Sequence, residues 1–227
     1  MKKILVAIIL FCFLNVNSYS HLKHYAGVNY LEYDLYRNNT LIGSHKYDFI
    51  KKGDNLTVKS VVNFKITKLG VDLYKYFAES SENYEKNIFK SFNSTTIQNK
   101  KNKYVKINLN KDQNTLNIDG SSYKGDASAS YMVGTWWNHE IVKAKAQISA
   151  ISGRVIEQKV IFLGKKQIEI NGKQYEALHF KFLSSDETLP DNKKLNTDIW
   201  YDANSYLWLK AQFIKQGNWE YRLKKVK

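Results

Sequence analysis

The chain has 227 residues, a single cysteine and a formal net charge of +14. A positive field of this size attracts nucleic acid or anionic lipid. Apart from Arg37, Arg154 and Arg222, however, the basic residues are all lysines, whereas base readout relies heavily on the planar arginine fork. We therefore expect no nucleic-acid partner and retain an anionic envelope surface as a partner class.

The first 20 residues have the three-part layout of a secretory signal peptide. Lys2 and Lys3 precede a short apolar run, and small or polar residues follow it as far as Ser18 and Ser20, the two predicted cleavage points. The apolar run is much shorter than the roughly 20 residues that a membrane-spanning helix needs. We expect a periplasmic or secreted protein that is not an integral membrane protein.

Removal of the signal peptide would also remove Cys12, the only cysteine. The mature chain would then have no disulfide, no cysteine nucleophile and no cysteine ligand for a metal. Residues 21–227 are long enough for one large β domain, and no linker or low-complexity tract divides them. The sequence therefore predicts a single antiparallel β domain over residues 21–227.

From residue 27 onward, apolar and polar residues alternate with a period of two, which is typical of half-buried antiparallel strands. In the segment from Asn29 to Arg37, Leu31, Tyr33 and Leu35 share one face. The segment from Asp54 to Gly70 repeats this pattern, with its apolar face formed by Leu56, Val58, Val62, Phe64 and Ile66.

Turn residues separate these segments at short intervals. The sharpest signal is Asn171-Gly172, because both central positions of a type I′ turn need positive φ. The other predicted turns are Asn38-Asn39, Gly53-Asp54, Gly70, Asp119-Gly120, Ser152-Gly153, Ala203-Asn204 and Gln216-Gly217. The pattern predicts an all-β fold, in which a large meandering antiparallel sheet of roughly ten or more strands curls into a half-barrel or barrel.

One segment, YMVGTWWNHE at residues 131–140, has neither a strand nor a helix period. We expect a short non-strand or helical plug around residues 131–147 that closes an open end of the sheet and buries Trp136 and Trp137. Asn138 is a suitable N-cap for about two helical turns between Glu140 and Gln147. A plug with a purely structural role and a wall that gates a ligand both fit this pattern.

The sequence contains no complete catalytic or metal-binding motif among its candidates. The run from His139 to Lys143 begins like the zinc motif H-E-x-x-H, but lysine occupies the place of the second histidine. Asp198 and Asp202 have the spacing of a carboxylate pair, but an aspartate at Asp202 is better explained as the cap of the turn that follows it. The acidic stretch between Glu79 and Glu85 is predicted to be an exposed strand end or loop. No metal and no cofactor is expected.

Three segments resemble a known family of exported proteobacterial proteins, domain of unknown function 6134. They are LYRNNTLIGSHKYDF from Leu35, ISAISGRV from Ile148 and TDIWYDANSYLWLKAQF from Thr197. The sequence is more distantly similar to relatives that share a W-x-D-turn hairpin with periplasmic lipoprotein carriers. This resemblance implies a curved β-sheet with the TWWN segment inserted between its two halves, and it implies no catalytic residue.

Two functions remain open. The first is a non-enzymatic envelope protein that binds a lipid or another apolar molecule inside the curved sheet. Its candidate wall residues are Trp136, Trp137, Trp200, Tyr201, His45 and His179, the two histidines because each alternates with aromatic or small residues on its predicted strand. The second is a solid β scaffold that contacts another protein or an envelope surface through its lysine-rich exterior.

Overall fold

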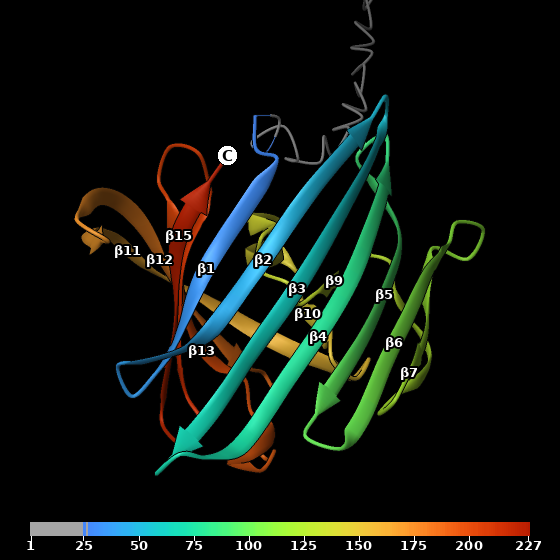
Figure 1. The fold of residues 1–227 in the computed structure, drawn as a ribbon. Coiled ribbons are helices and arrows are strands. Elements are labelled where there is room, and N and C mark those ends of the chain that lie inside the picture. Colours follow the sequence, from blue (N-terminus) through green and yellow to red (C-terminus); the bar gives the residue numbers. More distant parts are fainter. Residues whose placement is uncertain (1–24, 26) are drawn as a thin grey trace, which may run out of the picture.

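The computed structural model describes Tyr25 and residues 27–227, and these form one continuous sheet of 15 strands (Figure 1). Its strands are β1 (Tyr30–Arg37), β2 (Thr40–Lys52), β3 (Asn55–Lys68), β4 (Val71–Glu85), β5 (Ile88–Gln98), β6 (Lys101–Asn110), β7 (Thr115–Gly120), β8 (Lys124–Ser128), β9 (Met132–Val133), β10 (Ala146–Ile148), β11 (Val155–Ile170), β12 (Lys173–Ser184), β13 (Asn196–Asp202), β14 (Trp208–Ile214) and β15 (Asn218–Val226). The predicted signal peptide, including Cys12, lies outside the described residues.

The strands follow one another in the sheet almost in chain order. The order is β8-β7-β6-β5-β4-β3-β2-β1-β15-β14-β13-β12-β11-β10-β9, so the first and last long strands, β1 and β15, are neighbours. All pairs are antiparallel except β9 with β10. The sheet is curled but not closed, and this confirms the predicted all-β fold.

Side-chain alternation determines which face of each strand is buried. Leu31, Tyr33 and Leu35 on β1 are all fully buried, as their period of two predicts. On β3, Val58 and Phe64 are buried, while the lysines that follow each of them, Lys59 and Lys65, are exposed. The apolar face of the sheet is therefore its concave side.

The predicted turn at Asn171-Gly172 is confirmed. It joins β11 to β12, and both of its residues have positive φ, at 52° and 78°. Asn38 and Asn39 turn in the same way between β1 and β2, at 48° and 63°. The prediction at Asp119-Gly120 is wrong in position, because both residues still belong to β7 and the chain turns after them.

The plug, residues 131–151, lies inside the curl of the sheet (Figure 1). Its only helix is the 3-10 turn η2 (His139–Lys143), for which the Asn138 side chain accepts the Glu140 N–H at 3.1 Å. The predicted N-cap is confirmed, but the predicted two helical turns as far as Gln147 are wrong. The chain from Ala146 instead pairs with β11 as β10, and this pairing satisfies backbone groups that a longer helix would have used.

The plug joins two apolar clusters on the concave face. Trp137 and Ile141 pack in the larger cluster, which β1–β4 and β12–β15 form. Val133 and Ile148 pack in the smaller cluster on β5–β7. The two edge strands of the sheet, β8 and β9, do not pair with each other. Side-chain packing of the plug bridges the gap between them.

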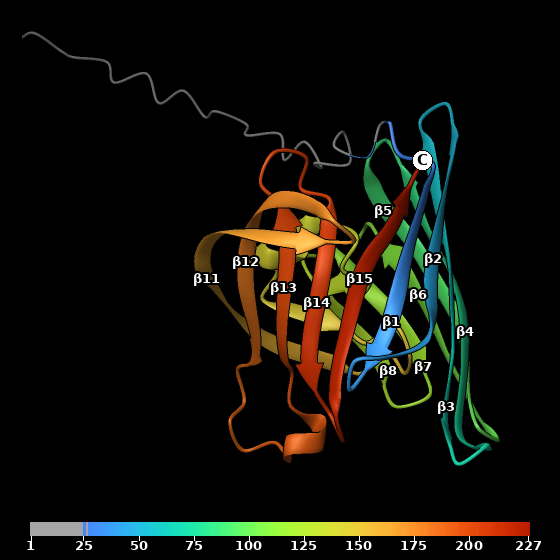
Figure 2. The same cartoon turned by 60° about the vertical axis from the view of Figure 1, so that its left-hand side comes forward.

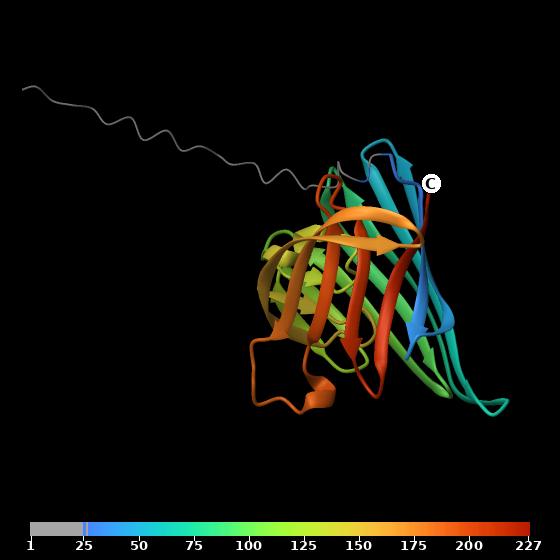
Figure 3. The ribbon, with the colours of Figure 1, turned by 90° about the vertical axis from the view of Figure 1, so that its left-hand side faces the viewer.

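The hairpin of β11 and β12 bends back across the outer side of β13 and β14 (Figures 2 and 3). The bend coincides with a register shift at Gly164, whose φ is 98°. At the hairpin tip, Asn171 Nδ2 donates to the backbone carbonyl of Leu223 at 3.0 Å. A second layer therefore covers part of the convex face.

A short 3-10 turn, η3 (Asp191–Lys193), lies between β12 and β13. No helix among the described residues has the length and apolar character needed to cross a membrane.

Candidate functional site

Three consecutive carbonyl groups of the plug each accept a hydrogen bond from a tyrosine hydroxyl. The pairs are Tyr47 with Thr135 at 2.7 Å, Tyr201 with Trp136 at 2.9 Å, and Tyr25 with Trp137. Trp136 has a φ of 60°, an uncommon conformation for a bulky residue. Three tyrosine hydroxyls thus hold residues 135–137, and the middle residue, Trp136, has a strained backbone conformation.

A buried carboxylate holds the same segment from the other side. Glu82 on β4 is 4% exposed and accepts the indole Nε1–H of Trp137 at 2.9 Å. It also accepts the Thr135 hydroxyl at 3.2 Å and the Tyr84 hydroxyl. Burial raises the pKa of Glu82, and these three donors oppose that effect.

A cavity of about 340 Å³ lies between the plug and the concave face of the sheet. The sheet supplies its aromatic wall, and the plug supplies one side. The main lining residues are His45, Tyr47, Val62, Tyr76, Ala78, Thr96, Thr135, Trp136, Gln147, Ile151, Phe213 and Tyr221. Its size and its mostly apolar lining are those of a small-molecule site.

Two side chains in this lining carry buried nitrogen atoms that have no hydrogen-bond partner in the described part of the chain. Neither Nδ1 nor Nε2 of His45 has a hydrogen bond with any described residue, and the same holds for Nε1 of Trp136. The His45 ring lies among aromatic rings, 4.2 Å from that of Tyr47 and 6.0 Å from that of Tyr221 between centroids. Since buried polar groups in proteins are nearly always hydrogen-bonded, these nitrogens are unusual among the described residues.

Four titratable side chains of the cavity lining are held in their neutral forms near neutral pH. Burial lowers the pKa of His45 to about 3 and raises that of Tyr221 to about 12. Burial also raises the pKa of Tyr76 and, more strongly, that of Tyr47. The cavity can therefore donate and accept hydrogen bonds near neutral pH, but these groups offer no ready proton acceptor or donor for catalysis.

A model of the family described as domain of unknown function (DUF6134) matches residues 33–224. The chain belongs to this family. No curated protein matches this DUF6134 protein. Among solved structures, it is similar to the crystal structure of a beta-barrel-like protein of domain of unknown function DUF1849 from Brucella abortus. The two share 12% identity over 87% of this chain and 96% of the other, with a TM-score of 0.61, a likeness of fold.

The structure brings together only some of the residues that the sequence singled out in this DUF6134 protein. His45 and Trp136 both line the cavity. Trp137 is fully buried in the larger apolar cluster, and Tyr201 is buried with its hydroxyl on the plug backbone. These two residues position the cavity wall and do not line it.

Trp200 and His179 lie on the other face of the sheet. Their rings stack at 4.2 Å with 11° between the planes, and His179 Nε2 lies 2.8 Å from a carboxylate oxygen of Asp198. Desolvation by burial lowers the pKa of His179, although Asp198 opposes this effect. Because Trp200 and His179 lie on the convex face, they cannot contact a ligand that is bound in the cavity.

Sequence reasoning missed Glu82, which we expected in an exposed strand end or loop. It lies within β4 and shares the concave face with Tyr76, Ala78 and Tyr84. The period of two from Tyr76 to Tyr84 would have placed it there. Asp202 does cap its turn, since its Oδ1 accepts the Ser205 N–H at 2.7 Å.

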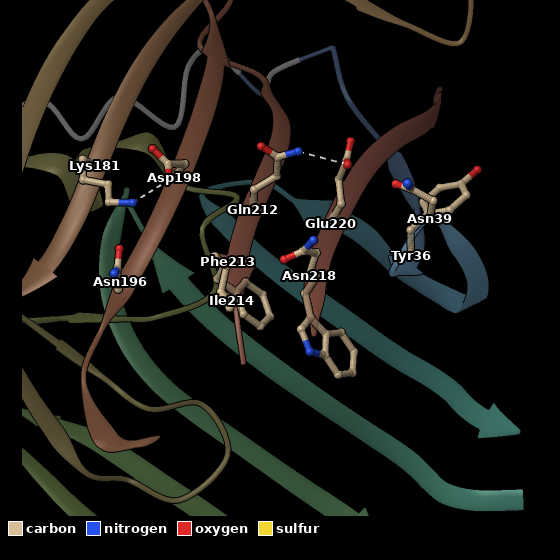
Figure 4. A pocket seen from close by; sticks show the side chains of 11 residues that line it. Tyr36, Asn39, Lys181, Asn196, Asp198, Gln212, Phe213, Ile214, Asn218 and Glu220 are labelled. Atoms are coloured by element: carbon tan, nitrogen blue, oxygen red, sulfur yellow. Dashed lines mark hydrogen bonds and ion pairs between the residues drawn. The ribbon is translucent and has the colours of Figure 1, made fainter. Parts of the chain in front are cut away.

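A second hollow, of about 390 Å³, lies on the convex face over β12–β15 (Figure 4). Four of its charged and amide groups are paired with one another. Lys181 contacts Asp198 at 2.6 Å, and Gln212 donates to Glu220 at 3.0 Å. These four groups therefore have partners within the chain.

His139 and Glu140 at the end of the plug contact each other at 3.1 Å, and Lys143 contacts Glu140 at 2.9 Å. Within the described part of the chain, no three His, Cys, Asp or Glu side chains gather in a way that could hold a metal ion.

Proposed function

We propose that this protein is an exported, non-enzymatic binding module that holds one largely apolar molecule in the cavity beside Trp136. The observation that carries the proposal is the pairing of an aromatic lining with the unpartnered nitrogens of His45 and Trp136. A bound molecule with a hydrogen-bond acceptor, such as a carbonyl or carboxyl group, would satisfy the indole N–H.

The size of the cavity narrows the ligand class. A volume of about 340 Å³ is at the lower end of the range for small-molecule sites. It suits a single acyl chain or a compact ring system better than a lipid with several chains. A mostly apolar lining also favours a molecule that brings little charge into the interior.

The alternative of a solid β scaffold predicts a filled interior. The cavity and its unpartnered nitrogens support the binding module instead, because a packed interior has few voids larger than a water molecule. The neutral state of His45 and of the cavity tyrosines supports a binding role over acid–base catalysis.

The proposal is tested by native mass spectrometry of the protein purified from the exported fraction, together with titration by cis-parinaric acid, a fluorescent fatty acid. We expect a mass adduct that organic solvent removes, and saturable probe fluorescence that palmitate reverses. An adduct-free protein that also fails to bind the probe would overturn the proposal.

A further inference from the structure

Five connections of the sheet lie at the same end of the molecule, the lower end in Figure 3. Because the long strands are antiparallel, the same end carries the turns at residues 38–39, 69–70, 99–100 and 215–217 and the connection at residues 185–195. The cavity lining reaches this end through Leu195 and Lys215. A neighbouring hollow of about 660 Å³ shares both residues, along with Thr197 and Phe213, and continues the cavity outward.

Large apolar side chains are exposed at this end. Leu69 at the tip of the β3–β4 hairpin is 94% exposed, and Ile214 at the end of β14 is 82% exposed. The set is completed by Leu41, Val71 and Leu73. Single exposed leucines are common, but five large apolar residues at one end of the sheet resemble an interaction surface.

Leu69 also adopts an unfavourable backbone conformation. Its φ is 50°, in the left-handed region that non-glycine residues with large side chains rarely adopt. At the turns of residues 38, 99 and 171 this position is asparagine, which tolerates that conformation, while Lys86 and Gln216 adopt it in two other turns. Leu69 thus exposes a large apolar side chain and also has a backbone conformation that leucine disfavours. Such departures from local preference are typical of functional residues.

Lysines surround these apolar residues. The basic residues on the strand ends and connections here are Arg37, Lys65, Lys68, Lys75, Lys100, Lys101, Lys193, Lys194 and Lys215, and the acidic ones are Asp72, Asp186, Glu187 and Asp191. Asp72 is already engaged by Lys75 at 3.1 Å and Lys65 at 3.7 Å. This end therefore has an excess of positive charge around an apolar tip.

We propose that this end of the sheet docks on the surface of an anionic phospholipid membrane, with Leu69 and Ile214 inserted among the headgroups and the lysines facing the lipid phosphates. Apolar side chains ringed by lysine match the two layers of such a surface, its acyl boundary and its negative headgroups. Docking in this orientation would bring the cavity mouth to the bilayer. The inference goes beyond ligand binding and does not require the cavity to be occupied.

The test is co-sedimentation with vesicles of phosphatidylethanolamine and phosphatidylglycerol, compared with vesicles of phosphatidylcholine alone. We expect binding to the anionic vesicles that weakens with added salt, and little binding to the neutral ones. Leu69→Asn should reduce partitioning by about tenfold, the effect of keeping one leucine in water. It should also leave the thermal midpoint unchanged or raise it, because asparagine suits the turn.

A matched control uses the opposite end of the sheet. Ile88 is 52% exposed next to the β4–β5 turn, so Ile88→Asn should leave vesicle binding unchanged. Likewise, Lys68→Gln with Lys215→Gln should weaken binding severalfold, whereas Lys52→Gln with Lys86→Gln should not. Equal losses from both ends, or no vesicle binding by the wild-type protein, would overturn the proposal.

The two proposals can fail separately. A cavity-filling variant, Val62→Phe, should keep its affinity for vesicles while losing the fluorescent fatty acid. A protein that binds vesicles but carries no adduct and binds no fatty acid would refute the binding module alone, and the reverse result would refute membrane docking alone.

Discussion

Trp137 and Glu82 are 55 residues apart in the chain, yet the indole Nε1 donates to the carboxylate at 2.9 Å in the interior. This contact ties the plug to β4. A buried carboxylate with three donors is costly to assemble, and removal of one member leaves the others unsatisfied. Glu82 thus adds a buried acceptor to the three tyrosine hydroxyls and the β10–β11 pairing that also hold the plug.

Glu82→Ala should lower the free energy of unfolding by about 3–5 kcal/mol, because Trp137, Thr135 and Tyr84 all lose their acceptor in a buried site. Glu82→Gln keeps one acceptor oxygen and should lose less. Urea unfolding followed by tryptophan fluorescence measures both changes.

Glu79→Ala is the control on the same strand. Glu79 is exposed, and its removal should change the free energy of unfolding by no more than about 0.5 kcal/mol. Equal urea midpoints for the alanine variants at the two positions would show that the Glu82 network does not hold the plug.

The sequence predicted the fold well because strand periodicity and turn chemistry are local properties. Alternation at Leu31, Tyr33 and Leu35 and the Asn171-Gly172 turn depend only on neighbouring residues. The site depends on contacts over long separations. Nothing near His45 in the sequence shows that it faces the plug while His179 faces outward, since that difference arises from the curl of the whole sheet.

Glu82 and the plug helix are two other features that the sequence did not predict correctly. Alternation along β4 places Glu82 on the concave face, but its acidic neighbours suggested an exposed segment. The residues after Lys143 suit a helix by composition, and they form β10 only because the edge of β11 is available to pair with them. In both cases a tertiary contact outweighed a local preference.

His45→Phe should make stability less dependent on pH between about 6.5 and about 3. The pKa of His45 is lowered to about 3 by burial, so the unfolded chain binds the extra proton first as the pH falls. That proton uptake destabilises the wild-type protein by up to about 1.4 kcal/mol per pH unit in this range.

Urea midpoints of the wild type and His45→Phe at pH 7 and pH 4 provide the measurement. The difference between the two proteins removes the contributions of other titratable groups to the pH dependence of stability. Glu82 is one of these groups. Its raised pKa acts in the opposite direction, because it makes stability fall as the pH rises above about 4.5. A constant difference between the two proteins at both pH values would contradict the burial of a neutral His45.

Gly43→Ala should destabilise the protein by about 1–3 kcal/mol, because a Cβ at this position would lie 2.1 Å from the carbonyl oxygen of Asn63 on β3. The strands must separate to admit the methyl group. Gly27→Ala is the control, since a Cβ there has no atom within 4 Å. Thermal unfolding compares them, and similar midpoints would mean that β2 and β3 adapt without strain.

Val62→Phe should abolish fatty-acid binding while its neighbour Val61→Phe leaves it intact. Val62 lines the cavity on β3, whereas Val61 points to the convex side and is 38% exposed. A phenyl ring at Val62 occupies space that the ligand needs, and we expect at least a tenfold rise in the dissociation constant for cis-parinaric acid, equivalent to about 1.4 kcal/mol. Thermal midpoints of the two variants show whether the added ring has damaged the fold. Equal probe affinities in two folded variants would place the fatty acid on the surface and not beside Trp136.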